Sequence, residues 1–323
     1  MSTAAVDSEP PTVSVVIPNL NGRHLLGRCL ERLREQTVSD METIVVDSGS
    51  EDDSVAFLQS NFPEAQVVAL VANRGFAGGM NAGIERARGA LVAFLNNDAE
   101  VDPSWLEELL ACLDRHPRAA AATSKLLLAD QRNTIDGAGD CLTPSFLPYP
   151  RGHGMPDRGQ FDEEVEVFSP AGAASLWRRS ALEDVGLFDE RFFAYYEDVD
   201  LGFRARLKGY ECWYAPKAVA YHQRGATAGS HTEFTLFHPL KNRWFLILKN
   251  APGRLLLRNA VWLALGEGFL WIRALRARKP LVVLRAYREI VRNIREVRAE
   301  RRTIQRDSRV SPGELKQLLR HRS

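Results

Sequence analysis

The stretch GALVAFLNNDAEVDPSWL, residues 89–106, joins an apolar run to a cluster of polar side chains. Residues 91–95 are all apolar, and Asn96, Asn97 and Asp98 follow them directly. A short apolar run of this kind is typical of a buried strand in a parallel sheet. The polar residues at its exit are explained either by a turn whose side chains bond the backbone or by a ligand site. In a ligand site, Asp98 would bind a divalent cation through oxygen.

Segments typical of strands and helices alternate on both sides of this stretch. Apolar runs predict strands within residues 13–18, 43–54, 65–72 and 90–98. Helical spacing of apolar residues, with proline and glycine at the boundaries, predicts helices within residues 23–36, 54–62, 75–89 and 103–117. This alternation predicts an α/β fold with a mostly parallel central sheet flanked by helices.

Polar side chains follow each of the four predicted strands. Ligands of such sheets bind beyond the carboxyl ends of the strands, so the four exits predict one site at a common rim. The residues at the exits are Asn19, Asn21, Asp47, Ser48, Ser50, Asn73, Asn96, Asn97 and Asp98. The glycines of NRGFAGGMNAG, residues 73–83, would let backbone N–H groups approach a phosphate before a helix N-terminus. This segment matches neither the dinucleotide-binding fingerprint nor the P-loop.

A second group of acids, Glu197, Asp198 and Asp200, follows the aromatic run of residues 192–196. Carboxylates at a helix start are favoured by the helix dipole, which is a purely structural explanation. Crowding beside aromatic rings would also raise the pKa of one of them, as a general base requires. His222, which ends another apolar run, is either a structural residue or a ligand.

The net charge of +1 conceals a division between two parts of the chain. Residues 1–240 contain 21 Lys and Arg against 35 Asp and Glu, whereas residues 241–309 contain 18 against 5. Basic amphipathic helices within residues 234–306 are typical of segments that bind a membrane surface. The alternative is a helical subdomain that packs on the acidic body. No motif indicates a nucleic-acid partner.

Other segments yield further expectations. Residues 1–12 contain acids without an apolar core, which predicts a disordered N-terminus and no signal peptide. The four cysteines form no CxxC pair, as is typical of free thiols in a reducing cytoplasm. Residues 136–164 are rich in Gly and Pro and predict a long loop. The apolar run of residues 255–272 is interrupted by Arg258 and Glu267, so we expect it to lie on a membrane or to be buried.

Six motifs in order resemble those of family-2 glycosyltransferases with the GT-A fold, and most closely those of bacterial rhamnosyltransferase-like members. The resemblance runs over residues 13–231. It implies a GT-A domain over residues 13–233, with a nucleotide-binding half at 13–118 and an acceptor half at 119–233. A basic helical extension over 234–306 and a tail over 307–323 would follow. The motifs are VSVVIPNLNG, ETIVVDSGSEDDS, NRGFAGGMNAGI, LVAFLNNDAEVDPSWL, AGAASLWRRSALEDVGLFDERFFAYYEDVDLGFRARLKG and YHQRGAT.

The resemblance also implies roles for individual residues. Asp198 stands where the family has its catalytic base, and Glu197 is the second choice. Asp98 would bind Mg²⁺ or Mn²⁺ at the position of the family's DxD motif, with help from His222; Asn96 departs from that motif and removes one carboxylate. The residues expected to bind the acceptor are Gly172, Asp200 and Trp177, although core packing is an equal alternative for Trp177. The residues expected to bind the nucleotide sugar are Pro18, Asn19, Asn21, Asp47, Ser48, Asn73, Gly75, Asn81, Asn96 and Asn97.

The implied activity is a metal-dependent, inverting transfer of a sugar from a dTDP-, UDP- or GDP-linked donor, with dTDP-rhamnose preferred. The acceptor would be a glycan or a lipid-linked hydroxyl in cell-surface polysaccharide synthesis, at the cytoplasmic face of the membrane. One alternative is a sugar-phosphate nucleotidyltransferase, which would need a basic Gly-rich loop where PNLNGRHLL stands. Another is a non-catalytic scaffold of the same fold, which the presence of Asp98, Asp198 and His222 disfavours.

Overall fold

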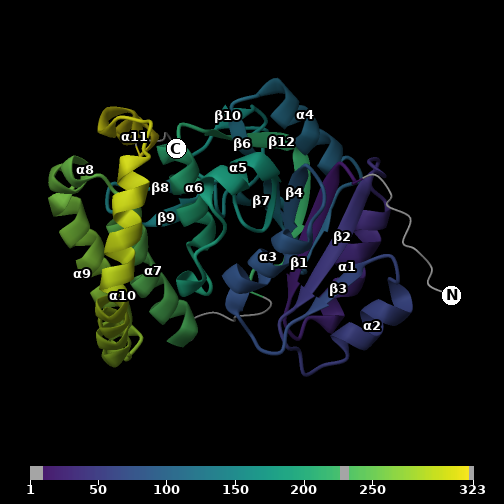
Figure 1. Cartoon of the computed structure of the whole chain (residues 1–323), viewed down its shortest axis with the longest axis horizontal. Coiled ribbons are helices and arrows are strands. Elements are labelled where there is room, and N and C mark those ends of the chain that lie inside the picture. The colour runs from purple at the N-terminus through teal and green to yellow at the C-terminus, as the bar shows by residue number, and fades with distance from the viewer. Residues whose placement is uncertain (1–9, 226–232, 320–323) are drawn as a thin grey trace.

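The computed structural model describes residues 10–225 and 233–319 of the chain. Its centre is a ten-stranded mixed sheet (Figure 1). Six strands run in one direction, and β11 (Ala174–Arg178) lies antiparallel between β4 and β6. The six are β3 (Gln66–Ala69), β2 (Met41–Asp47), β1 (Val13–Asn19), β4 (Leu91–Leu95), β6 (Ala119–Leu128) and β12 (Glu211–His222). The predicted α/β fold with a mostly parallel sheet is confirmed.

Helices cover both faces of this sheet and share apolar cores with its strands. Helices α1 (Arg23–Arg34), α2 (Ser54–Asn61) and α4 (Trp105–Arg115) share one core with the strands. Helices α3 (Gly75–Arg86), α5 (Arg179–Val185) and α6 (Glu197–Leu207) share the core on the other face. A short 3₁₀ helix, η1 (Glu190–Phe192), precedes α6. The four helices predicted in the first half of the chain correspond to α1, α2, α3 and α4.

The segment predicted as a long loop, residues 136–164, is more structured than its Gly and Pro content indicates. It includes the end of β7 (Gln131–Gly137) and a two-stranded sheet of β8 (Asp140–Leu142) and β9 (Pro148–Pro150). Phe146 and Phe161 are buried within it, so apolar side chains anchor it to the body. The prediction of a loop was therefore wrong for residues 136–137, 140–142 and 148–150, whereas the rest of the segment lies outside the named helices and strands. Two short strands, β5 (Ala99–Val101) and β10 (Val165–Glu166), extend the main sheet along β12.

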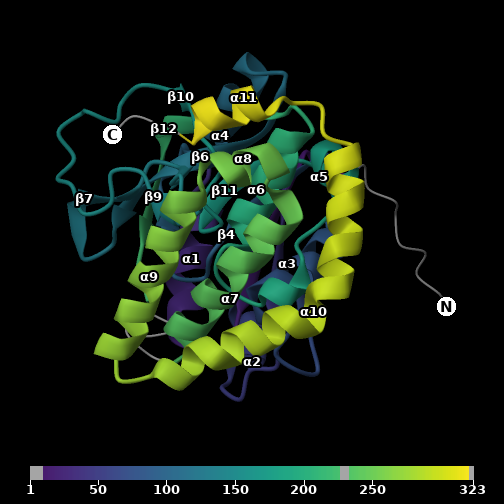
Figure 2. The ribbon, with the colours of Figure 1, turned by 90° about the vertical axis from the view of Figure 1, so that its left-hand side faces the viewer.

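The C-terminal part of the chain is helical and packs on the sheet domain. It comprises α7 (Glu233–Asn250), α8 (Gly253–Arg258), α9 (Ala260–Arg276), α10 (Pro280–Arg306) and α11 (Pro312–Leu318). Helix α7 lies between the body and the outer helices α9 and α10, as Figures 1 and 2 show. Its buried side chains include Lys241, Arg243 and Lys249, so part of the basic charge faces inward.

Three further expectations concern the ends and the thiols. The expected disordered N-terminus lies, for residues 1–9, outside the described part of the chain. The expected tail of residues 307–323 contains α11, with Leu315 buried. All four cysteines are free and buried. None of the described helices is both long enough and apolar enough to cross a membrane.

Candidate active site

Side-chain hydrogen bonds join the carboxyl ends of β1, β2 and β4. Asn19, which follows Pro18 in β1, donates from Nδ2 to Asp47 Oδ2 over 3.0 Å, and Asn97 Nδ2 donates to Asn19 Oδ1 over 2.8 Å. All three polar side chains are buried. The parallel register makes Asn19 and Asp47 direct partners across β1 and β2. Three residues expected to bind the nucleotide therefore lie together at one rim.

Asp47 both caps the turn that follows β2 and keeps acceptor capacity. Its carboxylate accepts from the backbone N–H of Ser50 over 2.9 Å and from Ser50 Oγ over 2.6 Å. Ser48 is buried beside it and donates its backbone N–H to the carbonyl of Asn19 over 2.8 Å. A carboxylate has about four lone-pair sites, so Asp47 can still accept the imide N–H of a pyrimidine ring.

The backbone at two predicted donor-site positions is left-handed. Asn21 has φ of 49° and is held by Ser50 Oγ, which accepts its backbone N–H over 2.8 Å. Gly75 has φ of 70°, and its N–H donates to Asn73 Oδ1 over 2.7 Å at the start of α3. A Cβ on Gly75 would lie 2.4 Å from the carbonyl oxygen of Phe193, so only glycine fits there. The donor side of the site is thus in direct contact with the loop before α6.

Asn81 lies apart from this group. Its amide is buried, donates from Nδ2 to the carbonyl of Phe188 over 2.9 Å, and accepts the N–H of Phe188 over 3.0 Å. Both ends of the amide therefore fix the chain after α5 to α3. This placement does not favour the contact with a nucleotide that the resemblance implies.

Asp98 and His222 meet where β4 and β12 end. Asp98 Oδ1 lies 3.3 Å from His222 Nε2, and Asn96 Nδ2 lies 3.4 Å from the same nitrogen. The buried Asn96 Oδ1 has no hydrogen-bond partner among the described residues, and the buried Asp98 Oδ1 has only the ion pair with His222. Buried oxygens beside an imidazole nitrogen form a donor set that suits a divalent cation. Asp98 and His222 fit the expected Mg²⁺ or Mn²⁺.

Asp136, which the sequence analysis missed, holds the other side of the His222 ring. Its Oδ2 lies 2.7 Å from His222 Nδ1, and its Oδ1 lies 3.1 Å from Arg224 Nη1. Burial alone would lower the pKa of His222, but hydrogen bonds and charges from Asp136 and Asp98 outweigh it and raise that pKa to about 9. A cation would displace this proton, so metal affinity is expected to rise with pH.

We expect Asp136→Ala to weaken Mn²⁺ binding by about 10- to 100-fold, because a carboxylate behind a metal-binding histidine fixes its tautomer and orientation. The loss of the free-ion electron paramagnetic resonance signal on titration measures binding without any turnover. Asp130→Ala removes an exposed carboxylate beside the same strand and is the matched control. Unchanged affinity in Asp136→Ala would show that His222 does not depend on this contact for metal binding.

Asp198 and Glu197 begin α6 in different environments. Asp198 Oδ2 accepts the N–H of Gly172 over 2.9 Å, its Oδ1 accepts the N–H of Val199 over 2.8 Å, and the residue keeps some accessible surface. Glu197 is buried, and its Oε2 has no hydrogen-bond partner in the described part of the chain. Burial and the charge of Asp198 raise the pKa of Glu197 well above its ordinary value. Burial also raises the pKa of Asp198, although hydrogen bonds from the backbone N–H groups of Gly172 and Val199 act to lower it. Asp198 is the better placed of the two to act as a base.

Residues 172–173 connect Asp198 to the Asn-Asn-Asp stretch. Gly172 donates its N–H to Asp198, and the carbonyl of Ala173 accepts the N–H of Asn96 over 2.9 Å. A Cβ on Gly172 would lie 3.1 Å from Asp198 Oδ2, so glycine allows the close approach. The candidate base and the candidate metal site therefore lie on either side of one short segment.

The loop between η1 and α6 is strained and is held by the C-terminal helices. Phe193, Tyr195 and Tyr196 have φ of 65°, 71° and 69°, a conformation that costs bulky residues energy unless their surroundings impose it. Asn242 of α7 is fully buried, and its Nδ2 lies within 2.9 Å of the carbonyl oxygens of residues 192, 194 and 195. The carbonyl of Phe193 in turn accepts the N–H of Ala77 in α3. Helix α7 thus fixes the loop that joins the donor side to the candidate base.

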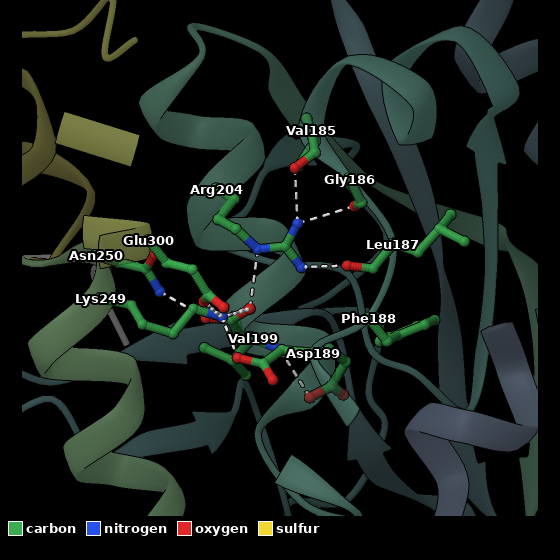
Figure 3. Close-up of polar contacts among 12 residues, drawn as sticks. Val185, Gly186, Leu187, Phe188, Asp189, Val199, Arg204, Lys249, Asn250 and Glu300 are labelled. Atoms are coloured by element: carbon green, nitrogen blue, oxygen red, sulfur yellow. Dashed lines mark hydrogen bonds and ion pairs between the residues drawn. The ribbon is translucent and has the colours of Figure 1, made fainter. Parts of the chain in front are cut away.

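Asp200, expected to bind the acceptor, lies in a buried network of hydrogen bonds. It has no exposed surface, and its carboxylate accepts from Arg204 Nε over 2.9 Å, Lys249 Nζ over 3.0 Å and Asn250 Nδ2 over 2.7 Å. Figure 3 shows Arg204 reaching from α6 to the backbone carbonyls of Val185, Gly186 and Leu187. This placement indicates a structural role for Asp200 and does not favour contact with an acceptor.

The other acceptor-side residues have contrasting positions. Trp177 is 1% exposed and stacks on Phe94 with ring centroids 5.9 Å apart, which agrees with the alternative of core packing. Asp140, which the sequence analysis missed, is buried in β8. Its pKa is raised well above the ordinary value by burial and by the charge of Asp198. The Gly- and Pro-rich surroundings of Asp140 gave no periodic signal that could have identified it.

The chain resembles known proteins along most of its described sheet domain. The family model described as glycosyl transferase family 2 matches residues 14–186. A protein of Sinorhizobium fredii is 31% identical over 68% of this chain, and this chain covers 25% of that protein. The O-antigen biosynthesis protein RfbC of Myxococcus xanthus is 31% identical over 62% of this chain and 16% of its own length. The chain thus spans a quarter or less of these two relatives.

One relative is matched over most of its own length. The N-acetylglucosaminyl-diphospho-decaprenol L-rhamnosyltransferase of Mycobacterium tuberculosis is 29% identical over 64% of this chain and 74% of its own. Two solved structures share the fold. GalNAc-T7 with UDP, GalNAc and Mn²⁺ has a TM-score of 0.61 at 17% identity, over 75% of this chain and 48% of its own. A Pyrobaculum calidifontis mannosyltransferase with GDP-Man and Mn²⁺ has a TM-score of 0.55 at 16% identity, over 93% of this chain and 86% of its own.

Proposed function

Because this chain belongs to glycosyl transferase family 2, we propose that it moves a sugar from a nucleotide-sugar donor to a hydroxyl group of an acceptor. The transfer depends on a divalent cation and inverts the anomeric carbon. The observation that carries this proposal is the segment of residues 172–173, which binds Asp198 on one side and Asn96 on the other. A base and a metal-binding carboxylate placed on either side of one segment suit a transfer between donor and acceptor.

The residues of the site divide the reaction between them. Asp198, held by the N–H groups of Gly172 and Val199, takes the proton of the acceptor hydroxyl. The hydroxyl oxygen at the same time attacks the anomeric carbon of the donor sugar, and the nucleoside diphosphate leaves. The attack comes from the face opposite the nucleotide, so one base and a single displacement invert the configuration. Glu197 stays neutral because its pKa is raised, and it leaves the negative charge on Asp198.

The donor side binds and orients the nucleotide. Asp47 would accept the imide N–H of a uracil or thymine ring. Asn19 Nδ2 donates to the Asp47 carboxylate and fixes its orientation. Asp98 and His222 would hold Mg²⁺ or Mn²⁺, which when bound would stabilise the negative charge on the departing diphosphate. Asp136 and Arg224 keep the His222 ring in place.

The preferred donor is dTDP-rhamnose, and UDP- and GDP-sugars are the alternatives. The matched rhamnosyltransferase of Mycobacterium tuberculosis supports this choice. The name of that enzyme contains a diphospho-decaprenol group, and we therefore place the acceptor of this chain on a lipid-linked glycan. A lipid-linked acceptor requires the enzyme to work at a membrane surface, which we take to be the cytoplasmic face.

Thermal unfolding with dTDP, UDP or GDP, each with and without Mn²⁺, tests the proposal. We expect one nucleotide to raise the midpoint only when Mn²⁺ is present, since a ligand at 100 times its Kd stabilises the fold by about 2.7 kcal/mol. Asp98→Ala should abolish the shift, whereas Asp114→Ala, an exposed carboxylate on α4, should retain it. A shift that needs no metal, or that survives in Asp98→Ala, would contradict the assigned site.

A further inference from the structure

The exposed apolar side chains of the described residues are concentrated on the outer C-terminal helices. Of the 13 large apolar side chains that are exposed, ten lie on α8, α9 and α10. Six of them form one line along α9, here called the outer stripe: Val261, Trp262, Leu265, Phe269, Ile272 and Leu275. Each is at least half exposed. A contiguous apolar patch of this kind marks an interaction surface.

The outer stripe is not the face by which α9 packs on the protein. From Trp262 onward its members follow one another at intervals of three or four residues, and Val261 lies four residues before Leu265, so they share one side of the helix. The opposite side carries the buried residues Gly266, Leu270 and Ala274. Glu267, at the edge of that side, binds Arg243 Nη1 over 2.7 Å and Trp244 Nε1 over 3.0 Å, and both partners belong to α7. The inner side already holds α9 in place, so the exposed surface of the outer stripe is left available to a partner.

Most of the charged residues that neighbour the outer stripe along the chain are basic. Residues 251–288 contain eight Lys and Arg and a single acid, Glu267. Glu267 points inward to Arg243, Trp244 and Tyr287, so its charge is paired within the protein. Arg258, Arg273 and Arg276 are exposed on the same helices. The outside of this region therefore offers apolar side chains bordered by cations.

Apolar side chains bordered by cations fit an anionic membrane surface better than a second copy of this chain. A bilayer with anionic phospholipids offers an apolar interior beneath a negatively charged surface, and arginine side chains can keep their charge at that surface while their stems lie in the apolar layer. A second copy of the chain, docked stripe to stripe, would bring the cationic borders together, and like charges across an interface disfavour association.

We infer that the outer stripe of α9 lies in the interfacial layer of an anionic membrane. The inference deepens the proposed function, on which it rests for the lipid-linked acceptor. Helix α9 is bound to α7, and α7 carries Asn242, which holds the loop before Asp198. Docking through the stripe would therefore set the candidate base at a fixed height above the lipid surface. Figure 2 shows α9 at the outside of the molecule, with α7 between it and α10.

Co-sedimentation with vesicles tests the inference without any transfer reaction. We expect the full chain to bind vesicles of phosphatidylcholine mixed with phosphatidylglycerol, and to bind pure phosphatidylcholine far less. Leu265→Glu/Phe269→Glu should lower binding at least about tenfold, because charges in the stripe oppose insertion. Met155→Glu changes an exposed apolar residue outside these helices and is the matched control. Arg273→Gln/Arg276→Gln should lower the preference for anionic lipid while leaving the stripe intact.

Three results would overturn the inference. The first is that the wild type binds neither kind of vesicle. The second is that the Leu265→Glu/Phe269→Glu variant binds vesicles as well as the wild type. The third is that light scattering shows a wild-type dimer and that the same variant is a monomer. The last result would assign the stripe to a second copy. A nucleotide-dependent thermal shift retained by the variant shows that it is folded. Vesicle binding without any nucleotide shift in the wild type would instead contradict the proposed function alone.

Discussion

Asp198→Asn is expected to lower kcat by about 10²- to 10⁴-fold, the range that a positioned general base contributes. The amide keeps the shape of the side chain but cannot accept the proton of the acceptor hydroxyl. Donor binding should persist, so the metal-dependent thermal shift with nucleotide should equal that of the wild type. Initial rates of sugar transfer at saturating donor measure the effect.

Glu197→Gln is the matched control for this prediction. Burial and the charge of Asp198 raise the pKa of Glu197 well above its ordinary value. Glutamine imitates a neutral acid, so we expect only a small change in kcat. A large loss in Glu197→Gln together with a small loss in Asp198→Asn would move the role of base to Glu197. Equal losses in both would indicate that the pair acts as a unit.

The pH dependence of kcat offers a second test of Asp198. Burial raises the pKa of this carboxyl, so the base loses its charge at a higher pH than an exposed aspartate would. We expect kcat to fall as the pH is lowered through this raised pKa and to level off above it. The acid limb should be absent from the residual activity of Asp198→Asn. A wild-type profile that stays flat down to the ordinary range of aspartate would contradict the assignment.

The clustering of Asn19, Asp47 and Asn97 at one rim of the sheet was predictable because its signal is local. The apolar runs end in Asn19, Asp47 and Asn97, and parallel pairing of the strands brings these residues into hydrogen-bonding contact whatever the details of the helices. The strand and helix pattern of residues 13–117 was predictable for the same reason, since it depends on short-range periodicity.

The residues that support the site could not be found in this way. Asp136 meets His222 from 86 positions away, and Asn242 meets the loop before α6 from about 50 positions away. Neither residue follows a strand that the sequence predicts, and neither stands in a recognisable motif. Burial also disfavours the contacts expected of Asn81 and Asp200, because both stand in the right motifs but hydrogen-bond to neighbours within the protein. Such partners depend on tertiary packing, which the pattern of a single sequence does not contain.

Lys249→Met is expected to lower the free energy of unfolding by about 3–5 kcal/mol, the usual effect of removing one partner from a buried ion pair. Lys249 is 2% exposed, and its Nζ lies 2.6 Å from Asp189 Oδ2 and 3.0 Å from Asp200 Oδ2. Figure 3 shows Lys249 reaching from α7 toward Asp189, beside Glu300 of α10. Methionine fills a similar volume, so the effect would come from the charge. Urea unfolding, followed by circular dichroism, measures it.

Acid should reduce the difference between Lys249→Met and the wild type. Burial alone would raise the pKa of Asp200, but Lys249 and Arg204 outweigh it and hold that pKa below its ordinary value. The ionised carboxylate therefore stabilises the wild type above the unfolded pKa of about 4, and this contribution disappears as the pH falls through the lower folded value.

Lys208→Met, which removes a more exposed partner of Asp184, should cost about 1 kcal/mol or less at neutral pH. Adding Asp200→Asn to Lys249→Met should restore part of the lost stability, because it removes a carboxylate left without its lysine. A Lys249→Met protein as stable as the wild type would mean that Arg204 and Asn250 alone compensate the buried charge, and that α7 is held to the sheet domain by its apolar contacts.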